Sequence, residues 1–158
     1  MNYSFKTSKN QDAISGTSKL MNILESANPN YCEAVTELYG KLLTAFGEPV
    51  YTTKSLEDAY CYVIIAKGDS EHILSIYEGS SGPAIGGKDS SSYDAARELI
   101  KYIKGMQPMD HEYEGYYFDG PTKIHRGIVN GKIFCSEVEI SFESEEYKQA
   151  YKEVYRNH

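Results

Sequence analysis

The stretch KIHRGIVNGKIFCSEVEI, residues 123–140, decides the fold of the C-terminal third of this chain. Asn130-Gly131 is the dipeptide that most strongly favours a two-residue β-turn, and Val, Ile and Phe residues flank it on both sides. The sequence therefore predicts a hairpin with strands at 123–129 and 132–140. A two-residue turn also fixes the register. The predicted cross-strand pairs are Val129 with Lys132, Gly127 with Phe134, and His125 with Ser136.

The predicted hairpin has two rows of side chains, because successive residues of a strand point to opposite faces. The first row is mostly apolar, whereas the second row ends in charge. We therefore expect the first row to face the core. The first row holds His125, Val129, Phe134, Val138 and Ile140. The second row holds Ile124, Arg126, Ile128, Ile133, Cys135, Glu137 and Glu139.

Hydrophobic periodicity predicts the elements upstream of the hairpin. The spacing of apolar residues at 20–27 and at 35–46 predicts two helices, and Gly47 is expected to end the second one. An apolar run at 59–66 predicts a central strand, since both of its faces are apolar. The remaining predicted elements are a strand at 72–77, a helix from about 92 to 103, a strand at 113–118 and a final helix at 143–156.

These elements follow the order ααββαβββα, which is typical of an α+β fold. We expect an N-terminal helical hairpin packed on a mainly antiparallel sheet of about five strands. Residues 1–16 are polar and lack periodicity, so they are expected to form an N-terminal arm. Residues 17–158 are expected to form a single α+β domain, because no repeat or linker interrupts them and the length suits one core.

Composition and charge limit the classes of function. The chain has 158 residues and a formal net charge of -7. This balance argues against nucleic-acid binding, because phosphate contacts require an excess of Lys and Arg. No apolar run approaches the roughly 20 residues of a membrane helix, so no membrane association is expected. The excess of acid lies after residue 56 and favours attraction of a basic partner.

The N-terminal sequence and the cysteines indicate a compartment. Residues 1–12 contain no apolar stretch of the kind found in signal peptides. Cys32, Cys61 and Cys135 are far apart and odd in number, and they lack the spacing of a zinc site. We therefore expect three reduced, structural cysteines in a cytoplasmic protein.

Residues 79–90 are rich in Gly and Ser and are expected to form a loop. Within it, GPAIGGK at 82–88 fits the phosphate-loop pattern, but Asp89 stands where that motif needs Ser or Thr. The sequence therefore argues against a nucleotide-binding loop. A simpler anion or phosphate site at a helix N-terminus stays open as an alternative. Its candidate residues are Gly86, Gly87, Lys88 and Ser90, with His125 nearby.

Patterns for catalysis and metal binding are weak. Asp110, His111 and Glu112 are adjacent, and neighbouring residues on an extended chain point to opposite sides, so they rarely chelate one ion. No Ser or Cys has an evident base partner. The sequence favours a non-enzymatic protein with no cofactor and no metal. A weak enzyme that uses the Gly-rich loop stays open as the alternative.

Aromatic and acidic residues gather at 112–119. Tyr combines a large apolar body with a polar tip and is enriched in protein interfaces. One row of this strand could equally belong to the core, and both interpretations stay open. The acidic flanks favour a surface that faces a partner. The candidate partner-binding residues are Tyr113, Glu114, Tyr116, Glu137 and Glu139.

The segment YEGSSGP at 77–83, together with the size, the acidity, the helical start and the β-rich end, resembles the immunity proteins of bacterial toxin systems. The resemblance implies a protein that binds and neutralises a co-produced toxin, often a basic nuclease, without catalysis. It carries over no site residue. The expected partner is therefore a protein, with a basic toxin as the specific expectation. A homodimer joined along a sheet edge is the alternative assembly.

Overall fold

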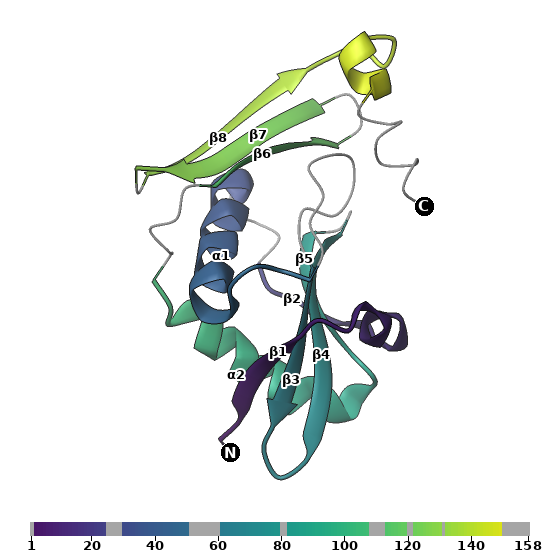
Figure 1. The fold of residues 1–158 in the computed structure, drawn as a ribbon, viewed down its shortest axis with the longest axis vertical. Coiled ribbons are helices and arrows are strands. Elements are labelled where there is room, and N and C mark those ends of the chain that lie inside the picture. The colour runs from purple at the N-terminus through teal and green to yellow at the C-terminus, as the bar shows by residue number, and fades with distance from the viewer. Residues whose placement is uncertain are drawn as a thin grey trace.

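Two antiparallel sheets and two α-helices make up most of the computed structural model (Figure 1). The structure describes residues 2–24, 30–50, 61–79, 82–107, 113–119, 122–130 and 132–149. Five strands form the body sheet, namely β1 (Ser4–Ser8), β2 (Ser18–Asn22), β3 (Cys61–Lys67), β4 (Glu71–Gly79) and β5 (Gly82–Gly87). Their order across the sheet is β1-β3-β4-β5-β2, and all neighbours are antiparallel.

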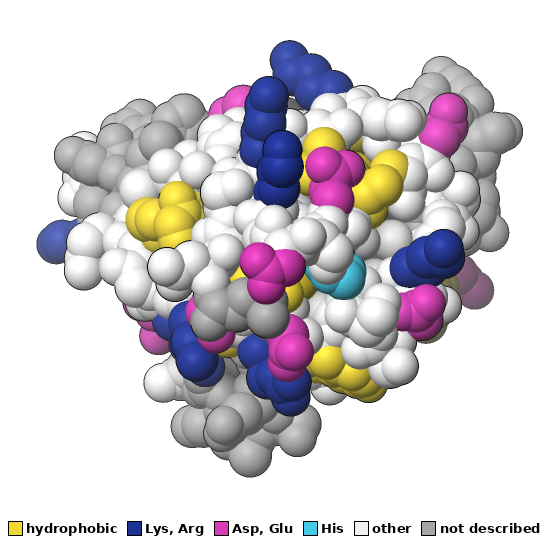
Figure 2. Space-filling view, turned by 90° about the horizontal axis from the view of Figure 1, so that it is seen from below, with side chains coloured by type: hydrophobic (Ala, Val, Ile, Leu, Met, Phe, Trp, Pro, Cys, Tyr) yellow, Lys and Arg dark blue, Asp and Glu magenta, His cyan; other side chains and the backbone are white. Residues whose placement is uncertain are grey.

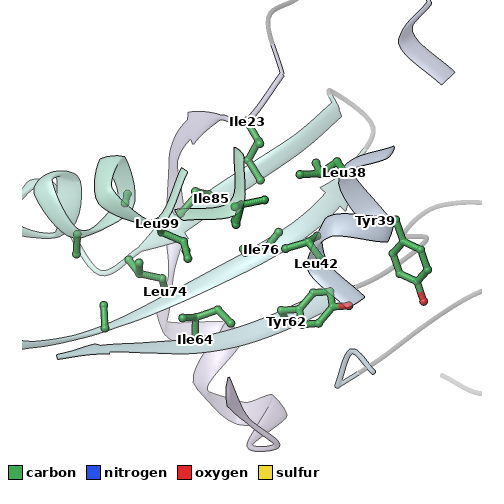
Figure 3. Close-up of a cluster of buried hydrophobic side chains, with 14 of the residues drawn as sticks. Ile23, Leu38, Tyr39, Leu42, Tyr62, Ile64, Leu74, Ile76, Ile85 and Leu99 are labelled. Carbon is green, nitrogen blue, oxygen red and sulfur yellow. The ribbon is translucent and has the colours of Figure 1, made fainter. Parts of the chain in front are cut away.

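The core lies between the body sheet and two helices, α1 (Tyr31–Phe46) and α2 (Tyr93–Lys104). Leu42 from α1, Ile64 from β3 and Leu99 from α2 belong to one buried cluster (Figure 3). The helices bury one face each because their apolar residues recur every three to four positions. Burial of such side chains is the main force that holds the body together.

Helix α1 ends where the sequence predicts. Gly47 has a φ of +75°, a conformation that glycine adopts without steric cost, and its N–H donates to the Leu43 carbonyl at 2.9 Å. The Tyr62 hydroxyl donates to the Gly47 carbonyl at 2.9 Å. Burial raises the pKa of Tyr62 well above its usual range, so this hydroxyl keeps its proton.

A separate C-terminal sheet contains β6 (Tyr113–Asp119), β7 (Thr122–Val129) and β8 (Lys132–Glu139), in the order β6-β7-β8. The predicted β7–β8 hairpin is confirmed, and so are its three predicted cross-strand pairs. Asn130 has a φ of 53°, as the first turn residue of a two-residue hairpin requires. Residues 145–149 form the start of the predicted last helix, where the Ser144 Oγ accepts from the Tyr147 N–H, and residues 150–156 lie outside the described residues.

The predicted order ααββαβββα is wrong. A strand comes first, and one long helix rather than a helical hairpin follows the first two strands. Residues 18–22 form β2 because they pair with β5, and this distant pairing overrides a short helical pattern. Residues 4–8 of the expected N-terminal arm form β1, which pairs with β3. The predicted strands are also divided between two sheets instead of forming one.

The predicted core row of the C-terminal hairpin is wrong as well. Ile124, Arg126 and Ile128 are buried, and they belong to the row that was expected to face solvent. Val138, from the expected core row, is 58% exposed. We call the buried row, with Cys135, Glu137 and Glu139, the inner row, and the other the outer row. Helix α1 packs against β7 and β8, and the disulfide described below joins it to the inner row.

The expected Gly-rich loop at 79–90 is largely a strand. Residues 82–87 form β5, which is buried and pairs with β4 on one side and β2 on the other. A Cβ atom on Gly86 would lie 2.6 Å from the Ser75 Oγ, and one on Gly87 would lie 2.6 Å from the Leu20 Cδ1. These glycines therefore allow close packing inside the body, and their presence does not indicate a loop.

Candidate functional site

A disulfide connects the C-terminal sheet to the body. Cys32, in the first turn of α1, is bonded to Cys135 on β8, with a Cα–Cα distance of 6.1 Å. This spacing is ordinary for a disulfide. The expectation of three reduced cysteines is therefore wrong for this pair, whereas Cys61 forms no disulfide and is buried in β3, as expected. The sequence offered no signal for the bond, because the two cysteines are 103 residues apart.

A buried ion pair makes a second connection between the two sheets. The Arg126 Nη1 on β7 donates to the Glu78 Oε1 on β4 at 3.0 Å, and the Nη2 donates to the Glu78 Oε2. The side chains are only 1% and 4% exposed. Two parallel bonds between a guanidinium and a carboxylate fix the relative orientation of both groups. We call the disulfide and this ion pair the two cross-links.

Helix α1 lies on one side of the C-terminal sheet (Figure 1). The inner row holds the buried side chains Ile124, Arg126 and Ile128, so the outer row faces away from α1. The rings of His125 and Phe134 meet edge to face, with centroids 5.1 Å apart. Beyond them, Val138 is 58% exposed, and Phe142, just after β8, is 54% exposed. Lys123 forms an ion pair with Glu146 beside them. This end of the sheet therefore combines exposed apolar side chains with charge.

The five candidate partner-binding residues lie on the two outer strands of the C-terminal sheet. Tyr113, Glu114 and Tyr116 belong to β6, at one edge of the C-terminal sheet, whereas Glu137 and Glu139 lie on β8, at the other edge. Strand β7 separates them. Val138 is exposed although its alternation along the strand favoured the core, and Phe142 is an exposed residue for which the sequence pattern gave no signal.

A cavity of about 600 Å³ lies at the opposite end of the molecule. Its wall includes His72, whose Nε2 is 2.9 Å from the Ser70 Oγ and whose Nδ1 is 3.2 Å from the Ser92 Oγ. Both ring nitrogens are thus held by hydroxyls that can donate or accept. The cavity is lined by Asp12, Ala13, Ser15, Gly16, Thr17, Glu71, His72, Ile73, Lys88, Asp89, Ser91 and Ser92.

The geometry of this cavity does not favour an anion. The Asp89 carboxylate accepts from the Ser91 N–H at 2.9 Å and from the Ser91 hydroxyl, so it places a negative charge on the short 3-10 turn Ser90–Ser92 that precedes α2. These hydrogen bonds hold the pKa of Asp89 below its ordinary value of 3.8. Asp12 and Glu71 add further negative charge beside the cavity.

The four candidate anion-binding residues are also spread out. Gly86 and Gly87 lie inside the body sheet, where Gly86 pairs with strands on both sides, and Gly87 packs against Ser92 at the N-terminus of α2. Lys88 and Ser90 are exposed on the segment that follows. Figure 2 shows that acidic and basic side chains are mixed on the underside of the molecule, without a large patch of one sign.

No group of three or more His, Cys, Asp or Glu side chains suited to a metal ion occurs in the described part of the chain. The sequence Asp110-His111-Glu112 lies outside the described residues. Within the same limits, no helix has both the length and the apolarity to cross a membrane.

Comparison with known proteins yields no relative. No protein-family model matches the chain, and neither does any curated protein or any solved structure.

Proposed function

We propose that this chain is a non-enzymatic, acidic domain that binds a basic protein partner through the C-terminal sheet. The observation that carries the proposal is the exposure of Val138 and Phe142 at the free end of a sheet that two cross-links hold on the body. Contiguous exposed apolar surface commonly marks interaction sites, and Val138 and Phe142 are only four residues apart in the chain.

The cross-links support this proposal energetically. A surface that is ordered before binding loses less conformational entropy when a partner docks. The disulfide and the Glu78–Arg126 pair fix β8 and β7 to α1 and β4, so the exposed end of the sheet is positioned in advance. The net charge of -7 would attract a basic partner over long distances.

The experiment compares capture by two matched variants. Val138→Ser and Ile73→Ser each remove one exposed aliphatic side chain, from the C-terminal sheet and from the body sheet respectively; Ile73 is 44% exposed. With lysate of the source cell, we expect the wild type and Ile73→Ser to retain the same basic protein. Val138→Ser should bind it about tenfold more weakly, as expected for losing a buried aliphatic contact. Equal retention by both variants would refute the proposal.

We further propose that the partner is a toxin, which would make the chain an immunity protein. The supporting features are the acidity of the chain and the exposed apolar side chains of the C-terminal sheet. Co-production of the chain should restore growth to cells that make the captured protein, and Val138→Ser should restore less. A captured partner that does not impair growth would exclude this role.

The cytoplasmic location expected from the sequence stays a prediction, and the disulfide weighs against it. Disulfides persist in oxidising compartments and are rare in the reducing cytosol. Acid quenching of cells followed by thiol alkylation shows whether the protein is oxidised or reduced in the cell. One alkylated thiol, Cys61, is expected if the Cys32–Cys135 bond persists in the cell. Three alkylated thiols would indicate a reduced cytoplasmic protein.

A further inference from the structure

We propose that the partner adds an extended, antiparallel strand to the outer edge of β8, with basic residues opposite Glu137 and Glu139 and an apolar residue opposite Val138. This inference rests on the proposed function, because it specifies how the C-terminal sheet would hold its partner. A partner could bind the C-terminal sheet without adding a strand, and without an alternation of basic and apolar residues.

The backbone of β8 provides the first argument. Strand β8 is the last strand in the order β6-β7-β8, so one of its edges has no neighbour among the described strands. In a hairpin with a two-residue turn, the pair next to the turn is hydrogen-bonded and the bonding alternates from there. The Val129–Lys132 pair is the first, so Lys132, Phe134, Ser136 and Val138 bond to β7. The N–H and C=O groups of Glu137 and Glu139 therefore face the open edge.

Exposure along β8 is the second argument. Residues 132–135 include the half-buried part of the strand, where Cys135 is bonded to α1. All four residues at 136–139 are exposed. An exposed edge strand is a ready template for another strand. The accessible part of the edge is thus four residues long and contains both glutamates.

The side chains at this edge define the chemistry of the added strand. Residues directly opposite each other on neighbouring strands share a face. Basic residues opposite Glu137 and Glu139 would lie on the inner-row face, and the residue between them would lie beside exposed Val138. The matching segment therefore alternates basic and apolar residues. Lys123 on β7 lies opposite Val138 and forms an ion pair with Glu146.

A second copy of the same chain fits this edge poorly. Antiparallel self-pairing centred on Val138 would place Glu137 of each copy opposite Glu139 of the other. Like charges directly opposite each other destabilise a strand pair. The charges on the β8 edge therefore disfavour a homodimer and favour pairing with a basic segment.

The test uses synthetic peptides and the full chain, so it does not depend on finding the natural partner. The probe is a capped seven-residue peptide that alternates Lys and Val, and its control alternates Glu and Val. Amide shifts in an NMR titration report the site. We expect the Lys peptide to perturb residues 136–139 and to bind about tenfold more tightly than the Glu peptide, since two ion pairs replace two repulsions.

Methylation of the peptide backbone tests strand addition without altering the protein. In the antiparallel arrangement the Lys residues of the peptide exchange bonds with Glu137 and Glu139, whereas the Val amides point away. Methylating the Lys amides should abolish binding, and methylating the Val amides should leave it unchanged. Equal effects of the two modifications would overturn the inference, as would shifts confined to residues outside 136–139.

Two substitutions at one position provide the matched protein variants. Glu137→Gln removes only the charge and should weaken binding about threefold. Glu137→Pro also removes the outward N–H, at an edge position where proline is tolerated, and should abolish binding. If Glu137→Pro binds as Glu137→Gln does, strand addition is wrong. If the source-cell partner is retained as proposed while the Lys peptide does not bind, the inference fails and the proposed function stands.

Discussion

The body sheet and the C-terminal sheet are attached to the rest of the molecule by different physical means. The body sheet contributes Ile64, Leu74 and Ile76 to a continuous apolar core that α1 and α2 complete. The C-terminal sheet contributes no residue to that cluster among the described side chains. Besides a smaller apolar contact with α1, which buries Ile124 and Ile128, two specific bonds join it to the body. Apolar burial is spread over many contacts, whereas each specific bond can be removed by one substitution.

This difference suits a binding role. A sheet that is not needed to complete the main core can leave its outer row and one edge exposed. The two cross-links supply this order together with the packing of α1 against β7 and β8, where Ile124 and Ile128 are buried. Substitutions that remove the buried ion pair, a core side chain, the disulfide or a surface ion pair should therefore differ in their effects.

Replacing Arg126 by alanine should have the largest effect. It would leave the Glu78 carboxylate buried without its guanidinium partner, which costs about 3–5 kcal/mol in the free energy of unfolding. Chemical denaturation measures the loss. The control combines Glu78→Leu with Arg126→Met, because an apolar pair of similar size leaves no charge buried. A double variant as unstable as Arg126→Ala would show that uncompensated charge is not the cause.

Leu42→Ala should destabilise the body by about 2–5 kcal/mol, because this side chain is fully buried in the core of α1 and the body sheet. The same denaturation experiment applies. Ile73→Ala, on the exposed side of β4, is the matched control and should change stability by no more than about 0.5 kcal/mol. Similar losses in the two variants would contradict the location of the core.

Replacing Cys32 and Cys135 together by alanine should lower the free energy of unfolding by about 2–4 kcal/mol, since the bond closes a long loop in the unfolded chain. The wild type should lose stability when dithiothreitol is added, and the double variant should not respond. A wild type that is insensitive to the reductant would mean that the disulfide contributes nothing.

Lys123→Ala should have the smallest effect, at most about 1 kcal/mol, because its ion pair with Glu146 is partly exposed. Added salt should reduce the difference from the wild type. Lys101→Ala, which breaks the exposed pair with Glu98, is the control and should behave alike. A loss as large as that of the cysteine variant would show that this surface pair also holds the C-terminal sheet.

Local signals made part of this fold predictable. Asn130-Gly131 determines a two-residue turn by itself, so the hairpin and its register followed from adjacent residues. Apolar spacing likewise predicted α1 and α2. In these elements the deciding interactions lie within a few residues of one another.

The failures all involve residues distant in sequence. Arg126 lies in the buried row because Glu78 pairs with it, and nothing near Arg126 reveals that partner. Leu20 lies on a strand because β2 pairs with β5. The sequence pattern predicted a loop at Gly86, but Gly86 lies on a strand where the Ser75 side chain leaves no room for a Cβ atom. The candidate site was therefore only half predictable: Glu137 was identified as exposed and acidic, but exposed Val138 was assigned to the core.

Hydrogen exchange of the intact protein, with and without dithiothreitol, tests the contrast between the two sheets most directly. Breaking the Cys32–Cys135 bond should speed the exchange of amides in β7 and β8, because one of the two cross-links is lost. Amides of β3 and β4 should exchange at unchanged rates, since apolar burial holds them. Equal acceleration in both sheets, or none in either, would contradict this account of how the C-terminal sheet is held in place for a partner.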